Sequence, residues 1–208
     1  MGLILGSASF TRFMVNGEFQ KENLEEIQNS ISRFAFRNLD DFTEEERSVG
    51  WVNILNMFET DFEDRNFFKH PYIALSLRVD VRNVPRKALK QYCVEAENEL
   101  KQNEDLEVLS KRQRRDIKEW VSRSLLKRAI PRSNTYDMVW NTETSMLYFG
   151  AVSTTLCDEF AEYFLKTFDL TLSSVFPYSL AYQILEDEDM NPELLDGLRD
   201  SSFVEVKE

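Results

Sequence analysis

The sequence predicts an α+β protein in which a mixed or antiparallel sheet is packed with helices and a pair of helices projects from it. Three observations support this fold class. Residues 73–82 alternate apolar and polar side chains as a strand does, residues 136–152 have the pattern of a β-hairpin, and residues 111–130 have the periodicity of a helix that exposes charge. A chain of 208 residues with 16 phenylalanines is long enough for one sizeable core. We therefore expect a single domain over residues 1–185.

The first third of the chain predicts a strand, a helix and a second strand. A β-rich run over residues 3–15 is followed by Asn16-Gly17, a dipeptide typical of turns. Over residues 21–36 apolar side chains recur every three or four positions, which marks one face of a helix. The apolar run from Val49 then indicates a short strand.

The clearest strand of the sequence lies within residues 71–83, because apolar residues occupy every second position from Ile73. The apolar set is Ile73, Leu75, Leu77, Val79 and Val81, and the alternate set is Ala74, Ser76, Arg78, Asp80 and Arg82. We expect the apolar set to be buried and the alternate set to face water.

Two long helices, over residues 85–101 and 111–130, predict a helical projection over about residues 85–130. Pro85 suits the first position of the first helix. Ser110 and Gln113 have the spacing of a capping box at the start of the second helix, and Pro131 ends it. The apolar stripe of the second helix includes Trp120, so we expect Trp120 in the core.

The C-terminal third begins with the hairpin, whose strands are joined by residues 141–144, and continues into a helix over residues 155–168. Beyond Leu170 we expect a strand and a short turn of helix. Residues 186–208 are rich in Asp and Glu and predict a solvated, partly mobile acidic tail.

Charge is distributed unevenly, because a chain with a formal net charge of -12 contains one strongly basic helix. Nine basic residues, opposed only by Asp116 and Glu119, lie in this helix and directly after it: Lys111, Arg112, Arg114, Arg115, Lys118, Arg123, Lys127, Arg128 and Arg132. At about 100° per residue, Lys111, Arg115 and Lys118 share one side of the helix, and Arg112, Arg123 and Lys127 share an adjacent side. Clustered cations on an exposed face favour binding to phosphates, and solvation of the helix or an acidic protein partner is the alternative interpretation.

Catalytic motifs are sparse in this sequence. The one histidine, His70, has no nucleophile signature beside it, and the glycines are too scattered for a nucleotide-binding loop. Cys93 and Cys157 fall on apolar helix faces and are interpreted as small hydrophobes. A metal-dependent nuclease would need clustered carboxylates, and the candidates are Asp61, Glu63 and Asp64, and Asp200 and Glu205 with Lys207. We expect no cofactor, no metal site and no catalytic residues.

The opening residues contain no basic leader, and their apolar run is too short for a signal peptide or a membrane span. We therefore expect a cytoplasmic protein that does not contact a membrane.

Several motifs follow one another between residues 50 and 172: "GWV", the strand "IALSLRVDVRNVP", the basic helix "KRQRRDIKE" continuing into "LLKRA", a strand containing "W", and the helix "CDEFAEYFLKTF". This order resembles the recombination-associated protein RdgC family, most specifically from Lys111 to Trp140. The resemblance implies an α+β chain that dimerises into a ring around double-stranded DNA without sequence preference. It also implies association with the nucleoid and restraint of the recombinase RecA, and an older family label implies an exonuclease.

Carried over to this sequence, the resemblance implies that the nine basic residues named above face DNA as a backbone clamp within a homodimer. We also hypothesise that the acidic tail folds back onto the basic helix and competes with DNA. The alternatives are a protein-interaction module whose basic helix binds an acidic partner and, third, a metal-dependent nuclease.

Overall fold

In the computed structural model, which describes residues 9–17, 24–39 and 45–198, seven strands form one antiparallel sheet. They are β1 (Thr11–Asn16), β2 (Arg47–Asn53), β3 (Phe68–Lys69), β4 (Tyr72–Val81), β5 (Arg132–Asn141), β6 (Met146–Phe149) and β7 (Thr171–Ser174). The strand order is β2-β4-β5-β6-β1-β7, and β3 pairs with β4. The predicted fold class is confirmed.

The helices are α1 (Leu24–Arg33), α2 (Arg86–Asn103), α3 (Lys111–Arg128), α4 (Thr154–Phe168), α5 (Pro177–Asp187) and the 3-10 helix η2 (Pro192–Leu195). Residues 3–8 of the predicted first strand and residues 21–23 of the predicted first helix lie outside the described residues. Where a strand and a short turn of helix were predicted beyond Leu170, the chain forms β7 and the longer helix α5. Helix α5 ends at Asp187, so it crosses residue 186, where the acidic tail was predicted to begin.

One face of the sheet carries the hydrophobic core, and α1 and α4 cover it. The apolar set of β4 is buried there as predicted, from Ile73 to Val79. Phe160 of α4 stacks on Phe149 with ring centroids 3.8 Å apart, and Trp51 meets Phe160 edge to face. Burial of large aromatic rings removes much apolar area from water and stabilises the body.

The opposite face of β4 is also buried, so the prediction that it faces water is wrong. Ser76, Arg78, Asp80 and Arg82 are each at most 7% exposed. Arg78 donates to both carboxylate oxygens of Asp80, at 2.9 and 2.8 Å, and the Ser76 hydroxyl donates to Asp137 at 2.6 Å. Because Ser76, Arg78 and Asp80 form these hydrogen bonds, their burial costs less free energy than the burial of unpaired polar groups would.

Two segments that are not strands of the sheet cover this second face of β4, one after α1 and one after β2. Phe36 places its ring 4.1 Å from the guanidinium carbon of Arg78, and the Met57 carbonyl accepts from Arg78 at 3.1 Å. The Leu39 carbonyl accepts from Arg82. Because Phe36 passes directly over Gly50, a side chain at position 50 would collide with the Phe36 backbone.

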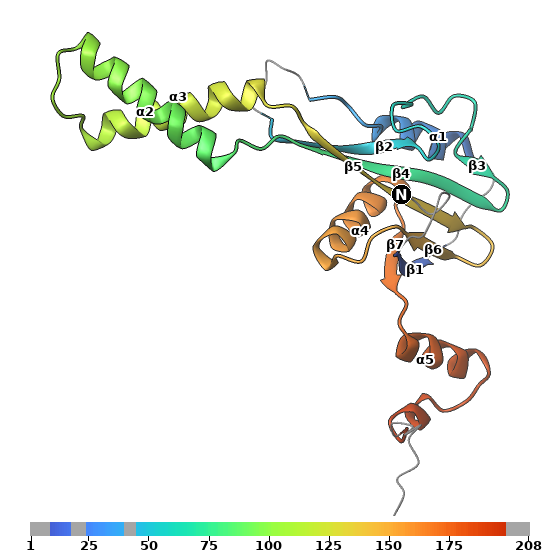
Figure 1. Cartoon of the computed structure of the whole chain (residues 1–208). Coiled ribbons are helices and arrows are strands. Elements are labelled where there is room, and N and C mark those ends of the chain that lie inside the picture. The colour runs from blue at the N-terminus through green and yellow to red at the C-terminus, as the bar shows by residue number, and fades with distance from the viewer. Residues whose placement is uncertain (1–8, 18–23, 40–44, 199–208) are drawn as a thin grey trace, which may run out of the picture.

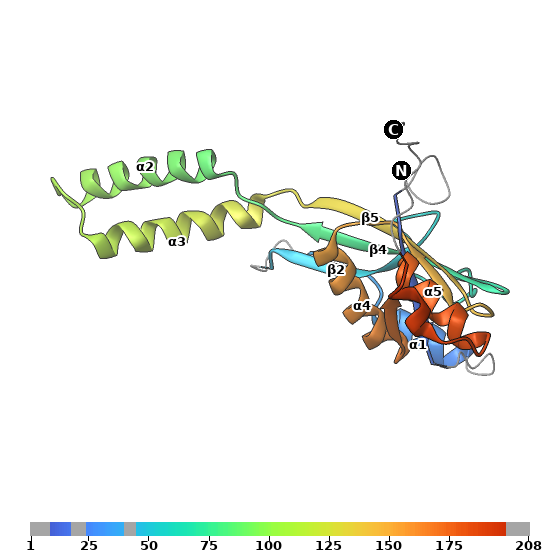
Figure 2. The same cartoon turned by 90° about the horizontal axis from the view of Figure 1, so that it is seen from below.

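The α2–α3 hairpin stands apart from the sheet. Figure 1 shows it projecting from the end of β4 and β5, and Figure 2 shows the two helices lying antiparallel, away from the sheet. At its base β4 and β5 pair without interruption from Tyr72 and Asn141 to Val81 and Arg132. This long ladder fixes the direction in which the hairpin leaves the sheet.

Candidate nucleic-acid interface

Helix α3 is positioned by a defined cap at its start and by the sheet at its end. The Ser110 hydroxyl accepts from the Gln113 amide at 3.2 Å, and the Gln113 side chain accepts from the Ser110 amide at 2.9 Å. The predicted capping box is therefore confirmed. The helix ends at Arg128, and the chain passes Pro131 into β5.

All nine predicted DNA-facing residues are exposed. Eight of them lie on α3: Lys111, Arg112, Arg114, Arg115, Lys118, Arg123, Lys127 and Arg128. Arg132 instead is the first residue of β5, beyond the end of the helix. The structure therefore concentrates most of the predicted set on one projecting element.

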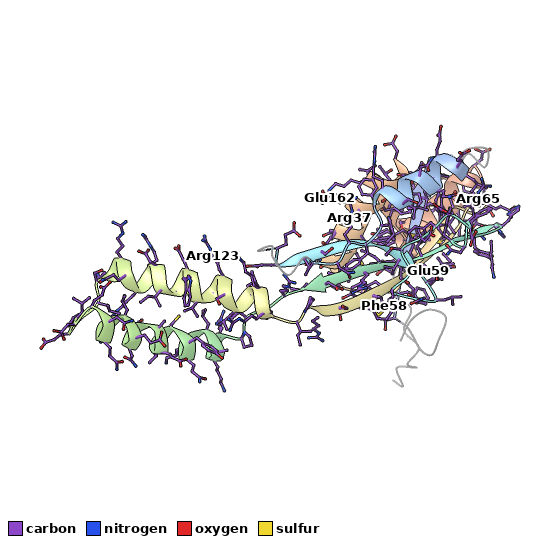
Figure 3. All side chains as sticks on the ribbon, turned by 90° about the horizontal axis from the view of Figure 1, so that it is seen from above. Arg37, Phe58, Glu59, Arg65, Arg123 and Glu162 are labelled. Atoms are coloured by element: carbon purple, nitrogen blue, oxygen red, sulfur yellow. The ribbon has the colours of Figure 1, made fainter. Side chains whose placement is uncertain are left out.

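Helical geometry divides six of these cations between two sides of α3. We call Lys111, Arg115 and Lys118 the lysine flank, and Arg112, Arg123 and Lys127 the arginine flank. Figure 3 shows side chains of α3 extending into solvent along its length, with Arg123 labelled near the end that joins the sheet. Each flank presents three cations along one side of a rigid rod.

The ion pairs of the two flanks are long and exposed. Arg112 lies 3.9 Å from Asp116, and Arg115 lies 3.9 Å from Glu119, in both cases measured from Nε to a carboxylate oxygen. Exposed pairs of this kind contribute about 0–1 kcal/mol and are screened by salt. A phosphate can therefore displace the carboxylate from either arginine at little cost.

Two of the predicted residues lie on the side of α3 that faces α2. Arg114 pairs with Glu97 of α2, and Arg128 lines a groove between the helices together with Tyr92 and Trp120. This groove holds about 300 Å³. This groove was not predicted from the sequence, although apolar residues at helical spacing in both helices, such as Tyr92 with Ala96 and Trp120 with Val121, are the signal from which it could be found.

Trp120 is 67% exposed, so the prediction that it belongs to the core is wrong. Val121, Leu126 and, in the preceding turn, Leu109 supply the buried positions of this region. All residues of α2 are at least partly exposed, so two helices packed only on each other bury a narrow seam. Trp120 lies at the edge of that seam.

Among the described residues, the carboxylates considered for a metal-dependent nuclease do not assemble into a centre. The Asp61 carboxylate accepts from the Glu63 amide at 2.9 Å, which caps a local turn. His70 lies 3.6 Å from Glu143 in an exposed pair. Within residues 9–17, 24–39 and 45–198, no three His, Cys, Asp or Glu side chains are grouped to hold a metal. Asp200, Glu205 and Lys207 lie outside the described residues.

The two cysteines are not bonded to each other. Cys157 is buried in the core of the body, as predicted, and Cys93 of α2 is partly exposed. Burial, followed by the charge of Glu97, raises the pKa of the Cys93 thiol, and Lys118 opposes this effect. A raised pKa disfavours the reactive thiolate.

Comparison with known proteins supports a family assignment. A family model described as "Putative exonuclease, RdgC" matches residues 9–185. A search of curated proteins found no match. Among the helices of the described ranges, none is both long and apolar enough to cross a membrane.

Proposed function

The chain belongs to the RdgC family of recombination-associated proteins, and from this premise we propose that it binds double-stranded DNA without sequence preference through α3. The observation that carries the proposal is that all the cations of α3 are exposed on a helix held away from the acidic body. Lysine and arginine side chains contact backbone phosphates, release condensed counterions and read no sequence. The protein would act as a clamp without a bond-breaking step.

The projection of the hairpin explains how an acidic protein can attract DNA. Helix α3 has 18 residues and is therefore about 27 Å long. The Debye length is about 8 Å at physiological ionic strength. The electrostatic field of the carboxylates of the body is therefore screened at the start of α3, which lies at the end of the hairpin away from the sheet. A duplex that approaches α3 from outside meets the local positive charge before the net charge of -12.

The two flanks are not equivalent as phosphate sites. Asp116 follows Arg112 by one helical turn and lies on the arginine flank, which lowers the net positive charge of that side. On the lysine flank Arg115 also lies 3.9 Å from Asp116 and from Glu119, but Lys111 and Lys118 lie on the side of the helix away from both carboxylates, and this flank continues into Arg114 at its edge. We therefore assign the main phosphate contacts to the lysine flank.

A pair of charge-matched variants tests this assignment. One replaces Lys111, Arg115 and Lys118 with Ala, and the other replaces Arg112, Arg123 and Lys127 with Ala, so each removes three positive charges. Binding to random-sequence duplex is measured across a salt series. We expect the lysine-flank variant to lose about 2–3 units of the slope of log K against log salt, and the arginine-flank variant to lose less.

Each alternative result has a defined meaning. Equal losses in the two variants would reject a preferred flank and indicate that α3 acts only through total charge. If the wild-type protein does not bind duplex DNA at low salt, the DNA proposal fails. The basic helix would then be assigned to an acidic protein partner, and capture of a polyglutamate peptide by wild type but not by either variant would support that assignment.

Hydrolysis is the second candidate function, because the family description names an exonuclease. Linear duplex incubated with the protein and Mg²⁺ would release nucleotides if this activity exists. We expect no release. Turnover that disappears in Asp61→Ala or in Glu205→Ala would instead establish a metal-dependent nuclease and identify the carboxylate cluster that it uses.

Restraint of a recombinase follows from the proposed clamp, because a protein seated on duplex phosphates blocks access to the same DNA. Such a protein would associate with the nucleoid. In a strand-exchange reaction with purified RecA, we expect the wild-type chain to slow product formation and the lysine-flank variant to slow it less. Equal inhibition by the two proteins would separate recombinase restraint from DNA binding by α3.

A further inference from the structure

Besides the α2–α3 groove, the protein has a pocket on the body, where the chain after α1 meets the start of β2 and α4. It holds about 330 Å³, and its charged lining residues are Arg33, Arg37, Glu45 and Arg47. Three arginines against one glutamate leave a net charge of +2 in a chain whose formal net charge is -12. Figure 3 shows Arg37 on the body, apart from Arg123 on the hairpin. We call this the cationic pocket, and it is separate from the basic helix α3.

Hydrogen bonds to β2 fix the backbone that carries these arginines. The Phe36 amide donates to the Trp51 carbonyl at 2.9 Å, and the Trp51 amide donates to the Phe34 carbonyl at 3.0 Å. The Ser48 hydroxyl donates to the Arg37 carbonyl at 2.5 Å. The segment after α1 therefore runs along β2 as an added strand would, and the pocket is formed before any ligand enters.

Tyr163 of α4 joins the two sides of the pocket. Its hydroxyl donates to the Phe34 carbonyl at 2.9 Å and lies 3.2 Å from the Val49 carbonyl, so it occupies oxygens that would repel an anion. Burial raises the pKa of the Tyr163 phenol to about 12, and the positive charge of Arg37 opposes this rise. The Arg37 guanidinium is therefore within electrostatic range of the phenol.

The donors of the cationic pocket are largely unused. Within residues 9–17, 24–39 and 45–198, neither Arg33 nor Arg37 forms an ion pair through its guanidinium. Arg47 donates to Glu159 at 2.6 Å, but a guanidinium has five N–H groups, so this contact leaves others available. The pocket can therefore offer hydrogen bonds from three cations to a ligand.

Three guanidinium groups around one pocket favour a phosphate group as the ligand. A guanidinium presents parallel N–H groups that match two oxygens of a phosphate or a carboxylate. A carboxylate has about four acceptor sites, which two forked arginines fill, whereas a terminal phosphate has three acceptor oxygens and up to two negative charges. The volume of about 330 Å³ leaves room for part of the molecule that carries the phosphate.

From these observations we propose that the cationic pocket binds a terminal phosphate group, with Arg33, Arg37 and Arg47 as its donors. The phosphate belongs either to a small molecule or to the end of a nucleic-acid strand. A phosphodiester within a duplex has only two free oxygens and a chain on both sides, so it suits the open surface of α3 better than a pocket. The proposal goes beyond DNA binding by α3 and does not depend on it.

Titration calorimetry of the full chain with inorganic phosphate and with pyrophosphate tests the pocket without DNA. Ionic strength is held constant with chloride, so that general screening does not change during the titration. We expect the wild type to bind at a single site per chain. We expect Arg37→Gln to weaken this binding at least about tenfold, because one of three charged donors is lost.

Arg86→Gln is the matched control, because it also removes one positive charge. Arg86 is exposed at the start of α2 and does not line the cationic pocket. We expect this control to bind phosphate as the wild type does. Arg37 is exposed as well, so circular dichroism should show unchanged folding in both variants.

A second measurement distinguishes the two sources of phosphate. Binding of a 5′-phosphorylated oligonucleotide is compared with binding of the same strand that ends in a 5′-hydroxyl, so contacts to the strand backbone cancel. A preference for the phosphorylated strand that disappears in Arg37→Gln and persists in Arg86→Gln would assign the pocket to strand ends. Binding of inorganic phosphate or pyrophosphate without this preference would assign it to a small molecule.

Two results would overturn the proposal. The first is a wild-type chain that binds neither inorganic phosphate nor pyrophosphate and shows no preference for the 5′-phosphorylated strand. The second is equal weakening by Arg37→Gln and Arg86→Gln, which would show that only total charge matters. The lysine-flank variant keeps the cationic pocket, so we expect it to bind phosphate normally. Failure of DNA binding by α3 and failure of the pocket are therefore separate results.

Discussion

The sheet body buries large aromatic side chains from strands and helices, whereas the α2–α3 hairpin buries only Val121 and Leu126 along its two helices. Phe160 contacts four other aromatic rings in the body, and Trp120 of the hairpin is mostly in water. Packing therefore constrains residues of the body, and the outer faces of the hairpin are free to carry charge. A basic helix is compatible with an acidic protein for this reason.

Truncation of one aromatic residue in each region should show the largest difference. Phe160→Ala removes a fully buried ring and leaves a cavity, so we expect the free energy of unfolding to fall by about 3–5 kcal/mol. Trp120→Ala should change it by less than about 0.5 kcal/mol. Urea unfolding monitored by far-UV circular dichroism measures both. Comparable losses would contradict the contrast between body and hairpin, as long as both proteins are measured at a concentration where they are monomeric.

The buried polar face of β4 allows a second test, because its charges contrast with the solvated charges of α3. Asp80→Ala leaves the Arg78 guanidinium buried without its bidentate partner, and we expect a loss of about 3 kcal/mol. The double variant Arg78→Met, Asp80→Leu should recover most of this stability. Thermal and urea unfolding check both variants. A cost of less than about 1 kcal/mol for Asp80→Ala would indicate that this face is solvated, as strand alternation alone predicts.

A smaller effect is expected for the hydroxyl that joins α4 to β2 and the segment after α1. Tyr163 donates to the Phe34 carbonyl at 2.9 Å and is also 3.2 Å from the Val49 carbonyl. We expect Tyr163→Phe to lower the free energy of unfolding by about 1–1.5 kcal/mol. Urea unfolding at neutral pH measures this loss, and an unchanged stability would show that the hydroxyl is equally well satisfied by water.

The same hydroxyl should give the body a defined alkaline response. Burial raises the pKa of Tyr163 from 10.0 to about 12, and the charge of Arg37 opposes this shift. The folded protein keeps the proton that an unfolded tyrosine loses near pH 10, so the contribution is complete below pH 10 and disappears as the pH rises through about 12. The difference in stability between wild type and Tyr163→Phe should therefore shrink over this interval. A difference that stays constant from pH 9 to about 12 would contradict the raised pKa.

The smallest predicted effect concerns the cap of α3. Ser110→Ala removes the hydroxyl that accepts from the Gln113 amide, at a cost of about 1 kcal/mol or less. Because the hairpin has little packing with the body, we expect faster hydrogen exchange in the first turns of α3 and unchanged exchange in β4. Ser110→Thr, which keeps a hydroxyl, is the control. Equal acceleration in both elements would show that hairpin and body open together.

Local patterns predicted most elements of the fold correctly. The alternation from Ile73 to Val79 identified β4, and the Ser110 and Gln113 pair with Pro131 located both ends of α3 closely, since α3 ends at Arg128. These features depend on neighbouring residues, through strand geometry, capping and the missing amide of proline. The exposure of the cations of α3 was also predicted, because a charged side of a helix remains in water unless another part of the protein packs against it.

The errors occurred where a residue's surroundings come from distant parts of the chain. Arg78 was predicted to face water, because the sequence does not show that Phe36 and Met57 lie over it. Trp120 was predicted in the core, because an apolar stripe does not reveal how many elements will pack against it. Strand β3 and the full length of α5 were also not predicted, because short elements carry little periodicity.

The sequence by itself determined where this chain forms strands and helices and that one helix carries a concentrated positive charge, because backbone preference and formal charge are properties of residues and their near neighbours. Only the tertiary structure decided which charges are buried and which remain available. The guanidinium groups of Arg78 and Arg115 have the same chemistry, but one lies between segments distant in the sequence and the other projects from an isolated helix. Desolvation depends on these long-range contacts, and it separates a structural ion pair from a phosphate contact.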